Sequence, residues 1–400
     1  MTAQPVRAAG FPFSSADPLE PPAEYARLRA REPLTRVTLP TGDLAWLVTR
    51  HADVRMVLTD PRFSREAITA PGAPRLLPIA QGSKSIFVMD PPEHSRLRGL
   101  VSRAFNPRRI LRLRPRVEHI TGELIDGMLS AGAPADLMAG LAQPLPITVI
   151  CELLGVPFSD VGQFRSWTDV MLSFDASRRD EVITARNHLN DYLTQLIETK
   201  RAQPADDLLK LLIDARDGGD RLSQEELLAF GYTLLGAGYH ATTSGIAHAV
   251  LTLQRLPGEW RRLAADRTLV PAAVEELLRL SQAGGGLGAL RIAVEDVEVS
   301  GVLVRAGEAI LPSINAANRD PDVFPAPDVF DLSRNPRLHL AFGYGIHHCL
   351  GAQLGRMELE VVLDALLRRM PRLAVAGGED GLRWSSGVAF SRPAELPVTW

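Results

Sequence analysis

One loop late in the chain concentrates the residue types that can do chemistry. In AFGYGIHHCLG, residues 341–351, one of only two cysteines stands among three glycines and two adjacent histidines. A thiolate is a soft anionic ligand suited to iron or zinc. A strong helical pattern follows Cys349, so we expect its sulfur at a helix N-terminus, where backbone amides favour an anion. Gly343 and Gly345 permit a tight turn with positive φ angles and let a flat partner approach the backbone.

Other interpretations of this loop need different surroundings. Zinc binding by His347, His348 and Cys349 has poor geometry, because three successive residues seldom converge on one tetrahedral ion and no CxxC or HxxxH pair supplies further ligands. A cysteine nucleophile needs a histidine base and an oxyanion hole, which adjacency in sequence does not provide. A glycine turn that happens to contain a core cysteine is the simplest interpretation of the loop alone. The rest of the chain decides against it.

A long helix, over about residues 223–254, is the main element expected to position chemistry. Ser223 and Glu226 form a capping box at its start. Roughly thirty residues at about 1.5 Å each span roughly 45 Å, so the helix must cross the molecule. Gly236 and Gly238 in its middle each cost roughly 1 kcal/mol relative to alanine. We therefore expect that something needs the space their side chains would fill, or the distortion they allow.

The remaining pattern predicts a mainly α chain with minor β structure. Residues 1–15 are expected to be irregular, residues 18–31 helical, and residues 35–50 a β-hairpin that turns at Pro40 to Asp43. Residues 92–280 show apolar side chains at helical spacing almost throughout. We predict one domain over residues 1–400, with minor β regions at 33–60, 290–310 and 372–400.

Composition limits the class of partner. A formal net charge of -3, with both signs spread along the chain, argues against a nucleic acid or an acidic membrane as the main partner. No run of eighteen apolar residues and no apolar leader occurs, so we expect a cytoplasmic protein that acts on a small molecule. Cys151 lies in an apolar run and is expected to be a buried helix residue, without a disulfide.

Several short motifs then occur in the order of one family. The string FGYGIHHCLG, residues 342–351, fits F-G-x-G-x-H-x-C-x-G. Glu276 and Arg279 form an E-x-x-R pair, and Arg334 stands where an arginine completes a triad. Residues 89–98, MDPPEHSRLR, and 317–321, ANRDP, match two further landmarks. This ordered set, which covers essentially the whole chain, resembles the cytochrome P450 superfamily of heme-thiolate monooxygenases. The resemblance implies a triangular, helix-rich fold with small β-sheets. It also implies an enzyme of the type found in bacterial secondary metabolism.

The resemblance also implies a heme b cofactor with Cys349 as the axial thiolate, a ligand that favours cleavage of the oxygen–oxygen bond. The two heme propionates must be paired with cationic donors once they are buried. The positions implied for those donors are His94, Arg98, Arg291 and His347. Further implied cofactor contacts are Ala237, Gly238, Phe342, Gly343 and Gly351. Glu276, Arg279 and Arg334 are implied to be structural, and His348 is left without a chemical role.

The same resemblance implies a substrate pocket formed by the long helix, residues 284–290, the loop before Met89 and a turn near Phe390. The implied substrate contacts are Phe87, Val88, Leu234, Gln282, Gly286, Leu287 and Phe390. GGGLGA, residues 284–289, formally fits the dinucleotide fingerprint G-x-G-x-x-A. That fingerprint must follow a strand and open a helix, whereas here a helix precedes and a strand follows, so we reject nicotinamide binding there. The glycines would instead widen the pocket.

The long helix departs from the family pattern A-G-x-[acid]-T-T. Ala237 and Gly238 match, but His240 stands in the place of the acid and Ala241 in that of the proton-delivering hydroxyl. His240 is either a proton donor or a buried helix histidine that points away from the cofactor. Thr242, a water chain or a hydroxyl of the substrate could deliver protons instead. We therefore take His240, Ala241 and Thr242 as the candidate catalytic positions.

These expectations combine into an oxidase that uses O2 and two electrons from a separate ferredoxin and its reductase. The ferredoxin is expected to dock beside the Cys349 loop on basic side chains. The expected substrate is a bulky aromatic molecule that is hydroxylated or joined by radical C–C or C–N coupling, as in relatives that act on tryptophan-containing cyclodipeptides. A macrolide, polyketide or terpenoid hydroxylase is the alternative, and a non-catalytic heme protein or a peroxide-driven enzyme is a different class. We expect a monomer.

Overall fold

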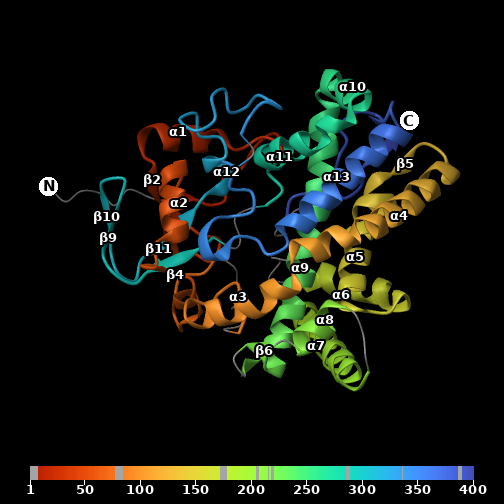
Figure 1. Cartoon of the computed structure of the whole chain (residues 1–400). Helices are drawn as coiled ribbons and strands as arrows, with labels where there is room; N and C mark the ends of the chain where they lie inside the picture. Colours follow the sequence, from red (N-terminus) through yellow and green to blue (C-terminus); the bar gives the residue numbers. More distant parts are fainter. Residues whose placement is uncertain are drawn as a thin grey trace.

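The computed structural model describes residues 8–76, 84–171, 178–203, 207–214, 216–217, 220–284, 289–335, 337–385 and 390–400. Helices make up most of the described chain, and β2, β4, β9, β10 and β11 lie on one side of it, on the left in Figure 1. The prediction of a mainly α fold with minor β structure is therefore confirmed. In that part of the chain no helix is both long enough and apolar enough to cross a membrane.

The long helix predicted from the sequence is α9, Gln224–Gln254. Its capping box is present, since the Ser223 hydroxyl accepts from the Glu226 amide and the Glu226 carboxylate accepts from the Ser223 amide. Figure 1 shows α9 in green, running through the middle of the molecule. It packs against α5, Pro144–Leu154, and against α13, Ala352–Arg369. A helix in this position can carry side chains to several sites at once.

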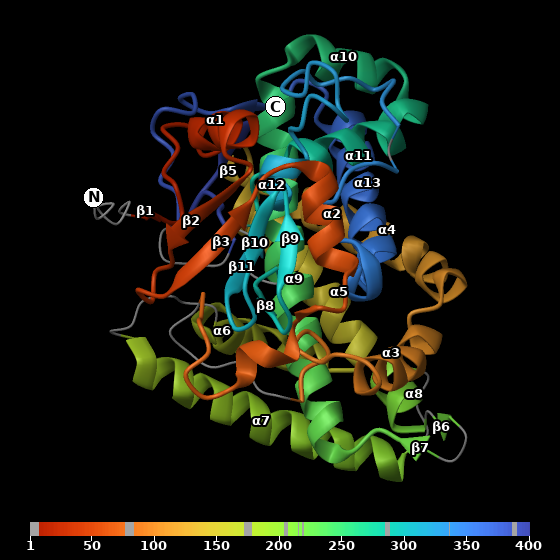
Figure 2. The same cartoon turned by 90° about the vertical axis from the view of Figure 1, so that its left-hand side faces the viewer.

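The other helices surround α9 and α13. Their bounds are α1 Ala23–Arg31, α2 His51–Thr59, α3 Glu93–Ala104, α4 Pro107–Ala131, α6 Val161–Met171, α7 Arg179–Ala202, α8 Leu208–Asp214, α10 Pro257–Ala265, α11 Val270–Leu280 and α12 Ile314–Ala317. The α4 helix lies along α13, and α7 lies along one edge of the molecule (Figure 2). Apolar side chains of α3 to α11 and of α13 form the largest buried cluster, whereas α1, α2 and α12 pack in two smaller clusters beside the largest sheet.

The largest sheet has six strands in the order β1-β2-β3-β11-β8-β4. Their bounds are β1 Ala9–Gly10, β2 Leu34–Thr38, β3 Leu44–Val48, β4 Phe63–Ser64, β8 Arg291–Ala293 and β11 Ala309–Pro312. The predicted hairpin is confirmed, because β2 and β3 pair antiparallel from Leu34 with Val48 to Thr38 with Leu44. The strand β11 pairs with β3 in parallel and with β8 antiparallel. The early hairpin and the strands near residue 300 therefore lie in one sheet.

Three small sheets complete the β structure. They are formed by β9 Val297–Val299 with β10 Val302–Val304, by β12 Ala374–Val375 with β13 Pro397–Thr399 and β5 Ala135–Asp136, and by β6 Arg216–Asp217 with β7 Asp220–Arg221. The predicted β regions at 290–310 and 372–400 therefore contain strands. Their strands are short, so they serve mainly to fix the loops between them.

Three predicted boundaries were wrong. The first helix begins at Ala23 and not near residue 18, because Pro22 occupies the cap in an extended conformation that proline also imposes on the residue before it. The predicted β region 33–60 includes a helix, α2, whose Val54, Val57 and Leu58 are buried at helical spacing. Within residues 1–15, expected to be irregular, β1 adds a short parallel strand to β2.

Candidate active site

The Cys349 loop is a tight turn that leads into α13. Gly343 and Gly345 both have positive φ angles, of 70° and 74°, as predicted. At Gly345 a side chain would also meet the Leu58 carbonyl, since a Cβ there would lie 2.8 Å from that oxygen. The turn is closed by the Cys349 amide, which donates to the Phe342 carbonyl at 2.8 Å. Glycine is therefore required in the turn by its backbone conformation and by the close approach of α2.

The two cysteines of the chain lie in different environments. Cys151 is fully buried in α5, as predicted, whereas Cys349 keeps an exposed face. Protein atoms crowd the Cys349 sulfur and raise the pKa of its thiol, while the Gly351 amide and the guanidinium groups of Arg98 and Arg356 act to lower it. Cys349 is thus the cysteine that can offer a thiolate to a metal, with amide and cationic support for the negative charge.

The other three predicted propionate donors surround His347, and a further side chain, Arg65, joins them. The His94 ring of α3 lies 4.4 Å from the His347 ring, centroid to centroid. Arg98, one helical turn after His94, donates to the His348 carbonyl at 2.7 Å. Burial and the positive charges of its neighbours lower the pKa of His347 to about 2. We call His94, Arg98, Arg291, His347 and the unpredicted Arg65 the cationic cluster.

Charge in the cationic cluster is not balanced by the protein. Burial and the nearby Arg65 charge lower the pKa of Arg291 to about 9, and burial lowers that of Arg65 to about 10. Asp90 is the acidic side chain that acts on both arginines. Three arginines against one carboxylate leave two positive charges if the histidines are neutral. Buried charge of this kind is costly unless an anion neutralises it.

Free hydrogen-bond donors accompany the unbalanced charge. Arg65 Nη2, His94 Nε2 and His347 Nε2 are buried and have no hydrogen-bonding partner among the described residues. Heme b has two propionates and accepts a cysteine thiolate as its axial ligand, which matches two surplus positive charges beside a loop that presents a cysteine. The residues present therefore fit this cofactor. When bound, the heme would supply activation of dioxygen for insertion into a substrate bond.

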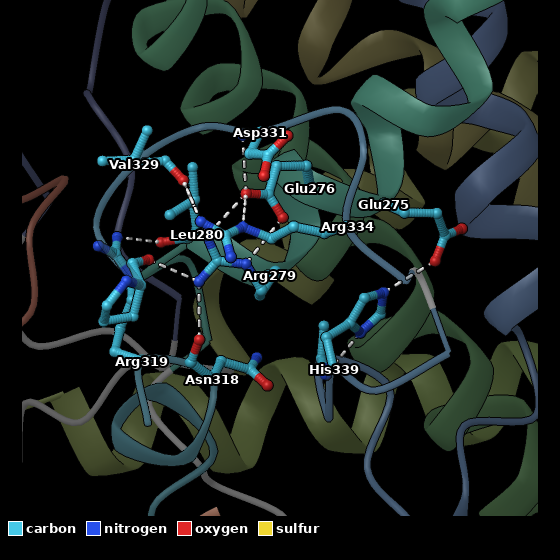
Figure 3. A network of polar contacts seen from close by, with 12 residues as sticks. Glu275, Glu276, Arg279, Leu280, Asn318, Arg319, Val329, Asp331, Arg334 and His339 are labelled. Carbon is cyan, nitrogen blue, oxygen red and sulfur yellow. Dashed lines mark hydrogen bonds and ion pairs between the residues drawn. The ribbon is translucent and has the colours of Figure 1, made fainter. Parts of the chain in front are cut away.

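The predicted structural triad of Glu276, Arg279 and Arg334 is assembled in the structure (Figure 3). Glu276 on α11 accepts two hydrogen bonds of 2.7 Å from Arg279 and one of 2.9 Å from Arg334. Arg279 also donates to the carbonyls of Asn318 and Pro327, at 2.8 and 2.7 Å. The three side chains thus join α11, the 317–321 segment and the segment before the Cys349 loop.

A second ionic group connects α11 with the cysteine loop itself. Glu275, next to the triad, accepts from His339 Nε2 at 2.8 Å and from Arg356 of α13. The Arg356 guanidinium lies 4.4 Å from the centre of the Phe342 ring, a cation–π contact. These bonds lower the pKa of the Glu275 carboxyl despite its burial. The predicted contact Phe342 is therefore covered by a guanidinium that is itself fixed by Glu275.

The segments predicted to form the substrate pocket meet in the structure. Gly284 and Phe390 form an isolated antiparallel β-bridge, and the Ser391 amide donates to the Ala283 carbonyl at 3.1 Å. The loop before Met89 reaches α9, because the hydroxyls of Ser85 and Thr233 lie 3.3 Å apart. Segments more than a hundred residues apart in sequence are thus brought side by side.

The individual predicted substrate contacts are placed unequally. Phe87 is exposed and Val88 is fully buried. Leu234 is a buried residue of α9. The Gln282 amide is turned to the Leu280 carbonyl, to which it donates at 3.0 Å. Gly286 and Leu287 lie outside the described residues. Around them the order of elements is α11, then β8, which is the reverse of a dinucleotide site.

His240 is bonded away from the cysteine loop. Its Nδ1 accepts from Arg392 Nη1 at 2.8 Å, so the proton is on Nε2, which lies 3.2 Å from the Thr168 carbonyl of α6. Burial and the Arg392 charge lower the pKa of His240 to about 3. Both ring nitrogens therefore have partners, and a second proton would place two cations in hydrogen-bonding distance.

Thr242 faces a different helix. Its hydroxyl interacts with the carboxyl of Glu358 on α13, a side chain that is 2% exposed. Burial raises the pKa of Glu358 to about 8, although the Thr242 contact acts to lower it. Glu358 Oε1 has no hydrogen-bonding partner in the described chain. Ala241 places only a methyl group between these two polar positions.

The helix glycine Gly238 serves packing. A Cβ there would lie 2.8 Å from Ile150 Cδ1, so its absence lets α5 approach α9. Ala237 lies in the same turn of α9. The expectation that something needs the space at Gly238 is therefore met by a neighbouring helix, because Ile150 fills that space.

Two residues with unusual environments were missed from the sequence. Arg65 stands in DPRFSRE and Glu358 in GRMELEV, and both match ordinary surface patterns of charged residues. Their burial arises from contacts with residues far away in the chain. For Glu358, the apolar helical stripe around it was a usable signal, because buried residues on both sides of α13 leave little room for a solvated carboxylate.

Comparison with known proteins agrees with this geometry. The sequence model of the family described as "Cytochrome P450" matches residues 150–375. The chain is 49% identical to nocardicin C N-oxygenase of Nocardia uniformis subsp. tsuyamanensis, and 47% identical to mycinamicin IV hydroxylase/epoxidase of Micromonospora griseorubida. Each match covers 98% of both chains. The crystal structure of cytochrome P450mel 107F1 "with biaryl coupling reactivity" is similar, with a TM-score of 0.93 and 39% identity, over 98% of this chain and 100% of that chain.

The sequence match over more than half of the chain, the identity to these relatives and the shared fold lead to one assignment. The chain belongs to the cytochrome P450 family of heme-thiolate monooxygenases.

Proposed function

We propose that the protein inserts one oxygen atom into an antibiotic precursor of the kind represented by nocardicin C or mycinamicin IV. In this reaction O2, two electrons and two protons convert a substrate bond to hydrogen into an oxygenated product and water. Nocardicin C N-oxygenase and mycinamicin IV hydroxylase/epoxidase are both named for oxygen insertion, and both match this chain along nearly its whole length. We expect Cys349 to hold the iron.

The observation that carries O2-dependent catalysis, over a heme protein that only binds a ligand, is the Glu358–Thr242 pair. Oxygen insertion consumes protons, so the enzyme needs a donor that is protonated at neutral pH. His240 does not meet this need, because its pKa of about 3 keeps it neutral and its one proton faces Thr168. Glu358 does, because burial raises its pKa to about 8. Ala241 has no hydroxyl to offer.

The proposed relay uses Thr242 as the intermediate. Its hydroxyl passes one proton toward the cofactor side and takes another from the Glu358 carboxyl. The resulting Glu358 carboxylate regains a proton from solvent before the next turnover. A raised pKa suits this cycle, since the Glu358 carboxylate is readily protonated again near neutral pH. His240 is then a positioning residue of α9.

The test combines labelled oxygen with matched variants. Turnover of nocardicin C and mycinamicin IV under 18O2 is expected to give a product that carries one labelled atom. Glu358→Gln and Thr242→Val are each expected to divert at least about ten times more of the electrons to peroxide, because a positioned general acid typically contributes about 10²-fold or more to the rate. His240→Gln is expected to divert the same fraction of electrons to peroxide as the wild type. Wild-type diversion in Glu358→Gln would refute the relay, and an unlabelled product would refute oxygen insertion.

Coupling of two aromatic groups is the second candidate function. It is favoured by Ala241, which removes the usual hydroxyl, and by the similarity to the P450 with biaryl coupling reactivity. Coupling would join two rings without adding oxygen. The 18O2 experiment distinguishes the two functions, because a coupled dimer carries no label, while its formation still consumes O2 and two donor electrons and leaves both oxygen atoms in water.

We further propose that electrons come from a ferredoxin and its reductase, that the protein works as a monomer, and that it does so in the cytoplasm. The loop that carries Cys349 also exposes Tyr344 and Ile346, with Arg55 stacked 4.3 Å from the Tyr344 ring centre. Exposed apolar and basic groups beside the metal ligand suit an acidic electron donor. Turnover with a ferredoxin pair, with peroxide alone and with no donor would separate an oxygenase from a peroxide-driven enzyme and from a ligand-binding heme protein.

A further inference from the structure

We propose that Arg65 is a cofactor-positioning residue that joins one heme propionate to two walls of the substrate pocket. The inference rests on the proposed function only in placing substrate against the Phe87 and Leu290 segments. Its other part, the contact with the cofactor, rests on the cationic cluster described above.

Arg65 is held by bonds to both segments. Its Nε donates to the Phe87 carbonyl at 2.8 Å, and its Nη1 donates to the Leu290 carbonyl at 2.9 Å. The side chain is 1% exposed, and the remaining nitrogen, Nη2, is buried without a partner among the described residues. A guanidinium presents its donors in a fixed planar fork. Two sides of this fork therefore fix the loops, and the third has no acceptor among the described residues.

The nearby carboxylate does not neutralise Arg65. The Asp90 oxygens accept from the Ser64 hydroxyl and from the backbone amides of Arg65 and Glu66. Asp90 therefore fixes the backbone at the end of β4, and no ion pair to the Arg65 guanidinium occurs among the residues that the structure describes. This arrangement orients the side chain inward and leaves its charge available to a ligand.

The position of Arg65 indicates which anion it would bind. It acts on the pKa of both Arg291 and His347, so its guanidinium lies in the cationic cluster beside the Cys349 loop. Two buried guanidinium groups side by side repel each other in a medium of low dielectric constant. A carboxylate between them would turn repulsion into two charge-assisted hydrogen bonds. A heme propionate is the carboxylate that the Cys349 loop would bring to this place.

One side chain would then couple the cofactor to the pocket. A substrate that displaces the Phe87 or Leu290 carbonyl would shift the guanidinium and so the electrostatic potential at the cofactor. The charge and the two carbonyl bonds can be separated experimentally. Arg65→Lys keeps the charge but loses the planar fork, so its single ammonium cannot bond both carbonyls. Arg65→Gln removes the charge.

The experiment compares the heme-loaded wild type with Arg65→Gln, Arg65→Lys and a control, Arg62→Gln. Arg62 is three residues away, pairs with Asp60 on the surface and lies outside the cationic cluster. Transfer of heme to apomyoglobin measures the propionate contact. Loss of one charge-assisted bond predicts about tenfold faster transfer from Arg65→Gln, and about wild-type rates from Arg65→Lys and Arg62→Gln.

Two iron ligands measure the pocket walls. Imidazole binds iron with little contact to the walls, whereas 4-phenylimidazole also fills the pocket, and both are followed by absorbance titration. Arg65→Lys is expected to weaken 4-phenylimidazole about tenfold and imidazole less than about twofold, because the walls lose their tie. The reduction potential of Arg65→Gln should fall below that of Arg65→Lys, since a cation near the cofactor favours the reduced state.

Each result decides one part of the proposal. Wild-type heme transfer and potential in Arg65→Gln would overturn the propionate contact, and equal weakening of both ligands in Arg65→Lys would overturn the tie to the walls. These measurements do not need the natural substrate. An unlabelled product from the wild type under 18O2 would refute the proposed function while the Arg65 results still stand.

Discussion

At the scale of single residues, buried charges in this protein are of two kinds. In the triad, Glu276 receives three hydrogen bonds from Arg279 and Arg334, so every charge has a partner inside the protein. In the cationic cluster, Arg65 and Arg291 are equally buried but lack equivalent carboxylates. Complete pairing indicates a structural role, whereas surplus charge with free donors indicates a ligand.

Glu276→Gln tests the structural role of the triad. The substitution leaves two buried guanidinium groups without their carboxylate, and breaking a buried ion pair typically costs about 3 to 5 kcal/mol. We expect a clearly lower denaturant midpoint for the heme-loaded protein. Glu118→Gln is the control, because Glu118 is half exposed and pairs with Arg114 at 3.7 Å, a surface contact worth about 0 to 1 kcal/mol. Equal midpoints for the two variants would contradict the structural role.

At the scale of elements, α9 presents different side chains to different partners. His240 and His248 are eight residues apart and so lie on one face of the helix. Both hold the segment after Phe390, since Arg392 bonds His240 and the Ser391 carbonyl lies 3.0 Å from His248 Nε2. Thr242 instead faces Glu358 on α13. Two histidines of α9 thus anchor the segment after Phe390, while Thr242 of the same helix takes part in the proposed delivery of protons.

The anchoring by His248 predicts a pH dependence of stability. Burial lowers its pKa to about 4, against an ordinary value of about 6.5 in the unfolded chain. Between these values the unfolded chain binds a proton that the folded chain excludes. The free energy of unfolding therefore falls as the pH decreases from about 6.5 to 4, by up to about 1.4 kcal/mol per pH unit, and this contribution is constant above that range.

Removing the histidine should remove that slope. His248→Gln keeps an amide donor for the Ser391 carbonyl and is expected to lose about one proton from the pH dependence of unfolding, measured by denaturation at several pH values. His119→Gln is the control, because His119 is exposed on α4 and pairs with Glu123 at 3.3 Å. An unchanged slope in His248→Gln would show that the buried ring does not titrate on unfolding.

At the scale of the whole molecule, the Cys349 loop links the interior to the surface. The sulfur lies beside the cationic cluster, while Tyr344 and Ile346 of the same loop are 36% and 48% exposed. Arg55 of α2 covers the Tyr344 ring and forms no ion pair with a carboxylate in the described chain. An electron donor that docks here would be separated from the metal ligand by only a few residues of one turn.

Arg55→Glu tests this docking surface. Reversal of a charge at the rim of an interface mainly lowers the association rate, so we expect kcat/KM for ferredoxin to fall about tenfold at low salt and the difference to shrink as salt is added. Arg262→Glu on α10, with its side chain 54% exposed, is the control. Peroxide-driven turnover should be alike in both variants. A salt-independent loss, or an equal loss in Arg262→Glu, would contradict docking at Arg55.

Much of the site was predictable because its parts are encoded locally. The turn at Gly343 and Gly345, the start of α13 after Cys349 and the capping box of α9 depend on residues within a few positions of each other. The same is true of the β2–β3 hairpin. Residues near in sequence are near in space in any compact fold, so such features need no knowledge of tertiary packing.

The sequence by itself determined the family, the cysteine loop and the Glu276–Arg279 pair, because motif spacing and helical periodicity specify them. Only the tertiary structure decided the direction of His240, the burial of Glu358 and the place of Arg65. Each of these depends on a partner between about 20 and 225 residues away, in Arg392, Thr242, Phe87 or Leu290. A side chain's charge state is set by its surroundings, and these surroundings exist only after the chain has packed.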